Sequence, residues 1–161
     1  MQKVHEPVPA LDNARVLVFP PLLLALCAGT AALTSWAIPS SGLRAIIAYP
    51  MAGLFAMAGL CLERWAQHSL RRANTTVHPS GSTRDVVSTG AFAWSRNPIY
   101  LAQGLLLVAV CCLLRSIAGF WVLLPWFLVM RVGVIAREER YLLGKFGPRY
   151  EAYLGKVRRW I

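Results

Sequence analysis

Residues 16–38 read VLVFPPLLLALCAGTAALTSWAI, a run of 23 residues without a charged side chain. At about 1.5 Å per helical residue, this run is long enough to cross a hydrocarbon core of about 30 Å. Three further apolar runs follow, over residues 45–62, 98–114 and 117–136. Only Arg115 and Ser116 separate the last two runs, and the final run includes Arg131. The sequence therefore predicts an all-α integral membrane protein with four transmembrane helices, of which the third and fourth form a tight hairpin.

The composition supports a membrane protein. Of 161 residues, 57% are hydrophobic and 15% are charged, whereas about a quarter of the residues in an ordinary soluble domain are charged. A cleavable signal peptide is the alternative explanation of the first run. The apolar core of such a peptide usually has about 7–15 residues, so the length of the run favours a transmembrane helix.

The basic residues predict the orientation in the membrane. With four spans, the N-terminus, residues 63–97 and the C-terminal tail share one side, which holds 15 of the 17 Lys and Arg residues when Arg131, in the second half of the fourth run, is counted with it. The other side holds Arg44 and Arg115. The positive-inside rule places both termini in the cytoplasm, and we expect the bacterial inner membrane. Because the net charge of +10 comes from residues that flank spans, it indicates contact with anionic lipid and no binding of nucleic acid.

The segments outside the apolar runs predict a single membrane domain with a functional loop. Residues 73–97 contain prolines and glycines that disfavour a helix, together with apolar side chains such as Phe92. Irregular segments of this length inside a small domain are uncommon and usually functional or disordered. Residues 137–158 predict short cytoplasmic helices that Phe146, Gly147 and Pro148 interrupt. The four cysteines lie within apolar runs without metal-ligand spacing, so we expect buried, reduced thiols and no metal site.

The start of the third apolar run is a candidate anion site. Asn97 is suited to cap a helix and Pro98 to begin one. The N-terminus of a helix offers free N–H groups and a partial positive charge, and Arg96 adds a bidentate donor. An ordinary capped helix preceded by a topology-setting arginine explains the same residues, and from this motif alone that explanation is favoured.

A pair of carboxylates follows the fourth run. Neither Glu138 nor Glu139 has a basic residue three or four positions away, so no local helical ion pair explains them. Arg131 lies seven residues before Glu138, on the same face of an α-helix, and is the expected partner. A solvated helix end is the alternative. Tyr100 shares a face of the third span with Asn97 and is a further candidate.

Three stretches of the chain resemble the isoprenylcysteine carboxyl methyltransferase family. They are TTVHP at residues 75–79, DVVSTGAFAWSRNPIYL at 85–101, and the segment 138–157 with its Glu-Glu, Phe-Gly and Tyr-Glu pairs. The broader group includes phospholipid N-methyltransferases. The resemblance covers about residues 74–159, and its parts occur in the family's order around a helical hairpin.

The resemblance implies a cytoplasm-facing site for S-adenosyl-L-methionine. The cofactor-binding positions that it implies are His78, Arg84, Asp85, Val86, Val87, Phe92, Arg96, Asn97, Pro98, Ile99 and Glu138. The candidate catalytic residues are Tyr100 and Arg131. The family's common Arg-His-Pro is Arg-Asn-Pro here, and Val134 stands where the eukaryotic enzymes have a substrate-proximal arginine, a role that Arg131 would have to take over.

The implied function is methyl transfer from S-adenosylmethionine to a lipid or prenylated small molecule that enters from the bilayer. The closest reaction is isoprenylcysteine carboxyl O-methylation, and phospholipid or amine N-methylation is the alternative. A sterol-type reductase that uses NADPH, with Arg71, Arg72 and Arg84 on its extra phosphate, is a rival from another class. A non-catalytic membrane subunit is a third possibility. The sequence leaves the natural acceptor, the pathway and the oligomeric state open.

Overall fold

The computed structural model describes residues 16–38, 42–73 and 86–161, and these residues are helical with short connections and no strand. The long helices are α1 (Pro20–Ala37), α2 (Ala45–Arg72) and α3 (Pro98–Leu113). One further helical rod is assembled from η2 (Ala118–Val122), α4 (Leu123–Val129), η3 (Met130–Ile135) and α5 (Ala136–Phe146). The shorter elements are η1 (Gly90–Ala93) and α6 (Pro148–Lys156). The prediction of an all-α protein is confirmed for these residues.

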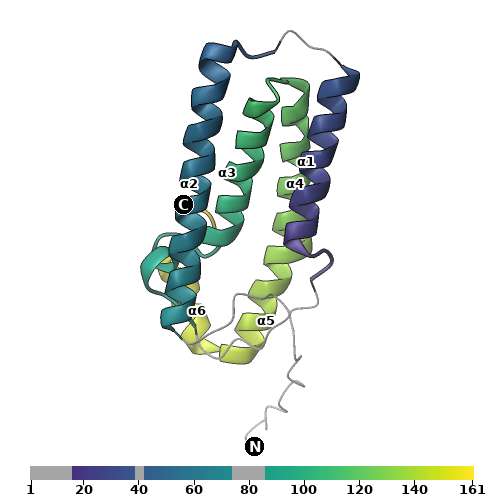
Figure 1. The fold of residues 1–161 in the computed structure, drawn as a ribbon. Helices are drawn as coiled ribbons and strands as arrows, with labels where there is room; N and C mark the ends of the chain where they lie inside the picture. Colours follow the sequence, from purple (N-terminus) through teal and green to yellow (C-terminus); the bar gives the residue numbers. More distant parts are fainter. Residues whose placement is uncertain (1–15, 39–41, 74–85) are drawn as a thin grey trace, which may run out of the picture.

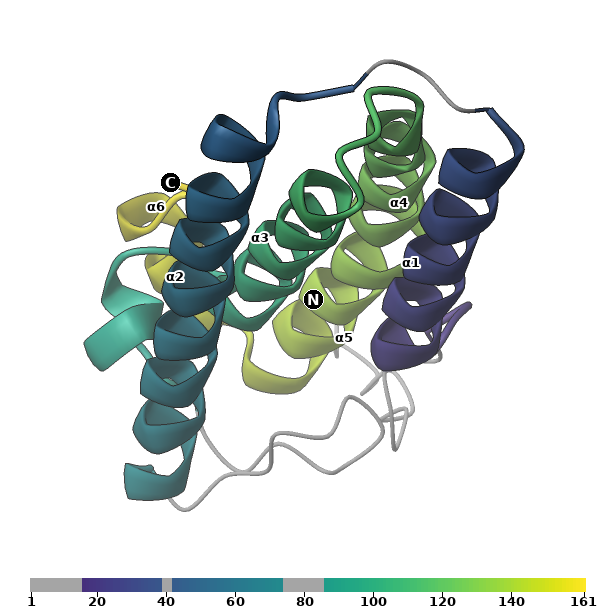
Figure 2. The same cartoon turned by 45° about the horizontal axis from the view of Figure 1, so that its top comes forward.

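The long segments lie side by side, with α3 and α4 between α2 at one edge and α1 at the other (Figures 1 and 2). Three of them are long and apolar enough to cross a membrane, namely Pro20–Ala37, Ala45–Arg72 and Ala118–Phe146. α3 is apolar but has 16 residues, about 24 Å at 1.5 Å per residue. Three spans are therefore supported by length and composition. α3, which is the third of the four predicted spans, is not among them, so the total of four spans and the hairpin stay predictions.

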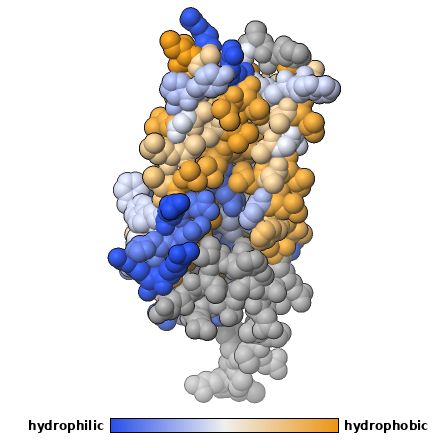
Figure 3. Space-filling view, viewed as in Figure 1, coloured by the Kyte–Doolittle hydropathy of each residue, from blue (hydrophilic) through white to orange (hydrophobic). Residues whose placement is uncertain are grey.

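The surface of the molecule matches a lipid environment. Large apolar side chains such as Leu33, Trp36, Ile46 and Met57 are exposed on α1 and α2. Figure 3 shows hydrophobic residues gathered over the middle of one face, with hydrophilic residues toward its ends. Water-soluble proteins rarely expose apolar surface on this scale, so the protein is an integral membrane protein.

The core lies between α1, α3 and α4. Leu107, Met130, Val134 and Ile135 are fully buried there. On the other side of α3, the close approach of α2 depends on Gly59, where an added Cβ would lie 3.1 Å from the Ala102 carbonyl oxygen. Small residues at helix crossings allow such close packing in lipid. Of the four cysteines, Cys61 is exposed on α2, so the prediction of buried thiols is wrong there.

Helix ends follow their sequence signals in part. Pro20, Pro98 and Pro148 each lie in the first turn of a helix, where the missing N–H has no intrahelical partner to lose. α5 ends at Gly147, whose φ of +52° lies in the left-handed region that glycine adopts without strain. The helices predicted for residues 137–158 and their interruption are confirmed.

The rod from η2 to α5 contains one irregularity that the sequence did not predict. Met130–Ile135 is a π-helix, in which each turn contains more residues than an α-turn. The Leu17 N–H donates to the Gly133 carbonyl of this segment at 3.2 Å, so the chain before α1 satisfies part of it. The π-helix sets the rotation of α5 and of its two carboxylates relative to the membrane rod.

The segment before α3 docks on α2. Gly90 has φ +62°, and an added Cβ there would lie 2.3 Å from Ser69 Oγ. The Ala91 N–H donates to the same oxygen at 3.3 Å. Residues 86–89 are irregular, and the predicted loop contains one 3₁₀ turn at Gly90–Ala93. This docking fixes where Arg96 and Asn97 enter α3.

Candidate active site

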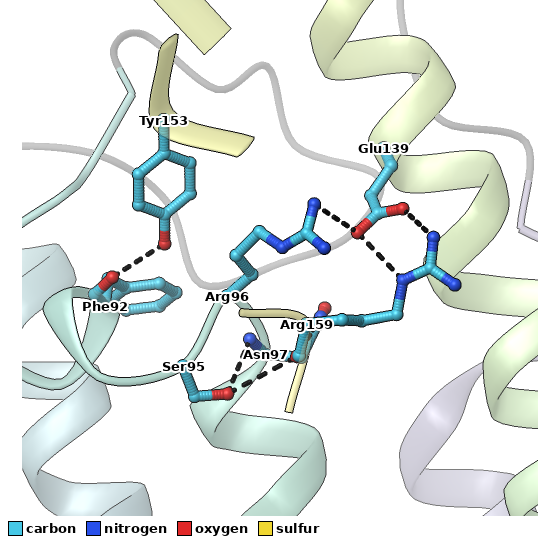
Figure 4. A network of polar contacts seen from close by, with 7 residues as sticks. All are labelled: Phe92, Ser95, Arg96, Asn97, Glu139, Tyr153 and Arg159. Atoms are coloured by element: carbon cyan, nitrogen blue, oxygen red, sulfur yellow. Dashed lines mark hydrogen bonds and ion pairs between the residues drawn. The ribbon is translucent and has the colours of Figure 1, made fainter. Parts of the chain in front are cut away.

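The charged end of the molecule, formed by residues 86–97, α5, α6 and the tail 157–161, brings distant parts of the sequence together. Figure 1 shows α5 and α6 at the end of the bundle where α2 also finishes. At its centre lies a cluster of Arg96, Glu139 and Arg159, which we call the Arg–Glu–Arg cluster (Figure 4). It joins the loop before α3, α5 and the tail, and its two arginines are 63 positions apart in the sequence.

In the Arg–Glu–Arg cluster, Glu139 is shared by two guanidinium groups. Arg96 Nη1 lies 3.1 Å from Glu139 Oε1. Arg159 makes two bonds to the same carboxylate, with Nε donating to Oε1 at 3.1 Å and Nη2 donating to Oε2 at 2.5 Å. The side chains of Arg96 and Glu139 are 14% and 13% exposed. Their interaction is therefore screened less by water and salt than a surface pair is.

The tail that carries Arg159 is held by the start of α3. The Arg96 N–H donates to the Arg158 carbonyl at 3.0 Å, and Asn97 Nδ2 donates to the Arg159 carbonyl at 2.9 Å. Next along the tail, the ring of Trp160 stacks on Phe127 of α4 at 5.3 Å between centroids. The tail is thus fixed by hydrogen bonds and by an aromatic contact.

Asn97 does not cap α3 in the way the sequence predicts. It occupies the N-cap position, but no side-chain capping hydrogen bond forms there. Its amide binds the tail, and its own N–H donates to Ser95 Oγ at 3.1 Å. The capping prediction for the Asn97 side chain is therefore wrong: the side chain is oriented by the bond from its Nδ2 to the tail carbonyl, and its oxygen accepts no bond from the first turn of α3.

Tyr100 and Glu138 form a second polar contact at this end. The Tyr100 hydroxyl donates to Glu138 Oε1 at 2.6 Å, and the Tyr100 ring belongs to the apolar core. The structure thus brings together two of the predicted site residues, one from α3 and one from α5.

Arg131 does not lie with them in the described part of the chain. It is exposed on the π-helix, and the bond to Glu138 comes from Tyr100 instead. The expected pairing assumed that seven residues return to the same face of an α-helix. The π-helix between Arg131 and Glu138 changes that rotation.

Two tyrosines of α6 border the Arg–Glu–Arg cluster. The Tyr153 hydroxyl donates to the Phe92 carbonyl at 2.7 Å. Burial raises the pKa of Tyr153 to about 12, although the nearby Arg96 opposes the shift. Burial also raises the pKa of Tyr150, and the negative charge of Glu139 adds to that increase. Both phenols stay protonated at neutral pH, and that of Tyr153 serves as a hydrogen-bond donor.

The other candidate positions divide into two groups. The segment that leads to α3 contains three of them, Val86, Val87 and Phe92, which are partly buried. The first turn of α3 contains Pro98 and Ile99. His78, Arg84 and Asp85 lie outside the described residues.

Sequence reasoning missed part of the Arg–Glu–Arg cluster and its surroundings. Glu139 carried a signal, since neither carboxylate had a local basic partner. Arg159 and Tyr153 were not among the predicted site residues. Ser95 was given no role. A spacing rule does not find these contacts, because each joins segments about 20 to 64 positions apart.

A family model described as phospholipid methyltransferase matches residues 47–149, which is more than half of the chain and includes α2, α3 and all of α5. This match places the protein in the class of membrane methyltransferases. The chain is a member of the phospholipid methyltransferase family, which includes isoprenylcysteine carboxyl methyltransferase-like membrane enzymes.

One curated protein is similar to part of this chain. An uncharacterized protein of Haemophilus influenzae is 40% identical over 63 residues, which are 39% of this chain and 100% of the relative. No solved structure matches the chain. The resemblance to the methyltransferase family deduced from the sequence is confirmed.

Proposed function

We propose that this protein transfers a methyl group from S-adenosyl-L-methionine to an amphiphile in the bilayer, at its charged end. The observation that supports this most directly is the Arg–Glu–Arg cluster, placed inside a chain of methyltransferase family. Two guanidinium groups and one carboxylate carry +2 and −1, which leaves one positive charge in the cluster. A partly buried positive charge favours an anionic ligand group such as the cofactor carboxylate.

The residues present fit that cofactor at its carboxylate and at its opposite, amino or adenosyl end. Among the described residues, the buried Nε atom of Arg96 has no hydrogen-bond partner. A buried donor without a partner costs free energy, so an added anion would stabilise this atom. Glu138 supplies the opposite charge, with Tyr100 donating to one of its oxygens. We assign Arg96 to the cofactor carboxylate and Glu138 to the amino or adenosyl end.

The chain's own groups act by binding and orientation. When bound, S-adenosylmethionine supplies an activated methyl group on a sulfonium, which needs no strong general base. Tyr100 orients Glu138, and Asn97 holds the tail that carries Arg159. Val86, Val87, Phe92, Pro98 and Ile99 would contribute apolar contacts, and His78, Arg84 and Asp85 would complete the site from the preceding segment.

For the acceptor, the carboxylate of a prenylated cysteine is the first candidate. Phospholipid or amine N-methylation is the second, and the description of the matching family favours it. Arg131, exposed on the π-helix, would contact an acidic group of the substrate from the lipid side. This arrangement requires four spans, with α3 as the fourth membrane helix and both termini in the cytoplasm of a bacterial cell.

The test is calorimetric titration of the purified protein in detergent micelles with S-adenosylhomocysteine. We expect wild type to bind, and Arg96→Ala to bind at least about 30-fold more weakly, the range for losing one partner of a buried charged contact. Arg140→Ala is the matched control, because Arg140 is exposed on α5 and, within the described part of the chain, donates to the Ala136 carbonyl of its own helical rod. Absence of binding by wild type would end the proposal.

A second assay identifies the acceptor. Labelled S-adenosylmethionine is added to the protein with either a prenylcysteine analogue or phosphatidylethanolamine vesicles. Base-labile label on the prenylcysteine indicates a methyl ester, whereas base-stable label on the phospholipid indicates an N-methyl group. Label on neither acceptor contradicts both assignments.

A further inference from the structure

The sharing of Glu139 is unequal. Arg159 binds both carboxylate oxygens, whereas Arg96 contacts only Oε1 through one nitrogen. Carboxylates prefer the two parallel bonds that a guanidinium offers, and such bidentate pairs are the stronger ones. Arg159 is thus the dominant partner of Glu139, and Arg96 is a secondary one.

The consequence concerns the donors that Arg96 retains. One Nη1 contact to Glu139 leaves other N–H groups of the Arg96 guanidinium for a different acceptor, and its buried Nε has no partner among the described residues. Without Arg159, the ion pair with Arg96 is the one that Glu139 keeps among those of the described residues given above. Glu139 would then satisfy both of its oxygens on Arg96 and neutralise the charge that an anionic ligand needs.

The position of Arg159 is itself fixed. Asn97 Nδ2 binds its carbonyl, the Arg96 N–H binds the preceding carbonyl, and Trp160 stacks on Phe127. Its side chain is 33% exposed, so it lies at the rim of the cluster and closer to water than Arg96. The backbone around Arg159 is thus held by hydrogen bonds, and its side chain is partly exposed. These properties suit a residue that holds the Glu139 carboxylate in place.

We infer that Arg159 is a positioning residue, which limits the contact between Glu139 and Arg96 to one pair of atoms, so that Arg96 keeps donors for the anionic group of the ligand. This inference rests on the proposed function, because the ligand is taken to be the cofactor carboxylate. It adds a role for a tail residue and for Glu139, neither of which was among the predicted site residues.

The experiment compares four proteins in calorimetric titration with S-adenosylhomocysteine: wild type, Arg158→Ala, Arg159→Ala and the double variant Arg159→Ala/Glu139→Gln. Arg158→Ala is the matched control, since its side chain is exposed and the hydrogen bond that it makes to the described residues comes from its carbonyl, which the variant keeps. We expect Arg159→Ala to weaken binding at least about tenfold while Arg158→Ala binds like wild type. The double variant should recover most of the loss, because a neutral amide at position 139 no longer neutralises the charge of Arg96.

Steady-state kinetics supply a second measurement. If Arg159 acts through cofactor binding, Arg159→Ala raises the KM for S-adenosylmethionine and leaves kcat within about twofold, the signature of lost uniform binding. Binding by Arg159→Ala equal to that of Arg158→Ala overturns the inference. So does a double variant as weak as Arg159→Ala, which would mean that the tail acts only by stabilising the fold. Wild type that does not bind refutes the proposed function itself, a separate outcome.

Discussion

The two ends of the helical bundle are built by different means. At the end opposite the site, Gly42 packs against the turn after α3, where an added Cβ would lie 1.4 Å from the Arg115 carbonyl oxygen. Arg115 Nε donates to the Leu43 carbonyl at 3.1 Å, and Ser116 Oγ accepts from the Gly119 N–H. We call this region the turn end. Its contacts are close backbone approaches and single neutral acceptors.

The charged end instead depends on ionic pairs between distant segments. Arg96 and Arg159 each bind Glu139, and the Tyr100 hydroxyl of α3 donates to Glu138 of α5. A partly buried ion pair stabilises a fold less reliably than good packing does, because desolvation opposes the attraction. Close packing therefore stabilises the turn end, whereas the charged end retains groups to which we assign the binding of a ligand. Variants at the two ends should therefore affect different measurements.

The largest effect is expected for Glu138→Gln at the charged end. The amide oxygen still accepts from Tyr100, so the variant removes the charge and keeps the hydrogen bond. We expect binding of S-adenosylhomocysteine to weaken by about 2–5 kcal/mol, as for other buried charge partners, with the unfolding temperature little changed. Titration calorimetry measures it, with Glu151→Gln on the exposed face of α6 as the control. Equal affinities of the two variants would remove Glu138 from the site.

The next effect should appear at the turn end and in stability alone. Gly42→Ala introduces the Cβ that meets the Arg115 carbonyl, so the backbone of the turn must move. Overpacking of this kind costs up to about 3 kcal/mol. Circular dichroism of thermal unfolding in detergent detects the loss. Gly29→Ala is the control, because a Cβ there has open space around it.

The comparison fails if Gly42→Ala changes ligand affinity in protein that is still folded. Such a result would mean that packing at the turn end is transmitted along the helices to the site. Unchanged stability in Gly42→Ala would instead show that the close approach is relieved without cost.

The smallest effect is expected for Tyr100→Phe. It removes the hydroxyl that donates to Glu138 and leaves the aromatic ring in the core. Loss of a hydrogen bond to a charged group costs about 1.5 kcal/mol at the lower end of its range, which is about tenfold in kcat/KM. Tyr49→Phe, at an exposed position of α2, should have no effect. A wild-type rate for Tyr100→Phe would mean that Glu138 keeps its orientation without the phenol.

The parts that the sequence predicted well are those that depend on local patterns. The second apolar run, predicted over residues 45–62, lies in one helix, α2, that extends to Arg72. Pro98 begins α3 and Gly147 ends α5, because proline and glycine restrict the backbone wherever they occur. Charge-free length predicted membrane helices, because an apolar helix has few other environments.

The site was predicted less completely, since it depends on where distant segments meet. Sequence reasoning chose Asn97 as a cap and Arg131 as the partner of Glu138. The structure uses Asn97 to bind the Arg159 carbonyl and Tyr100 to bind Glu138. The apolar pattern of residues 117–136 also gave no sign of the π-helix, because α- and π-turns bury similar residues.

The π-helix has a consequence for comparing this chain with its relatives. Its wider turns accommodate extra chain length without interrupting the helical rod, so a relative with a regular α-helix at Met130–Ile135 would need fewer residues there. An alignment that allows no gap in this segment would then pair Glu138 of this chain with the residue that is equivalent to Glu139 in space, and would assign each carboxylate the role of its neighbour. Glu138 and Glu139 are best matched to relatives by their partners, Tyr100 and Arg96, and not by counting from the last membrane span.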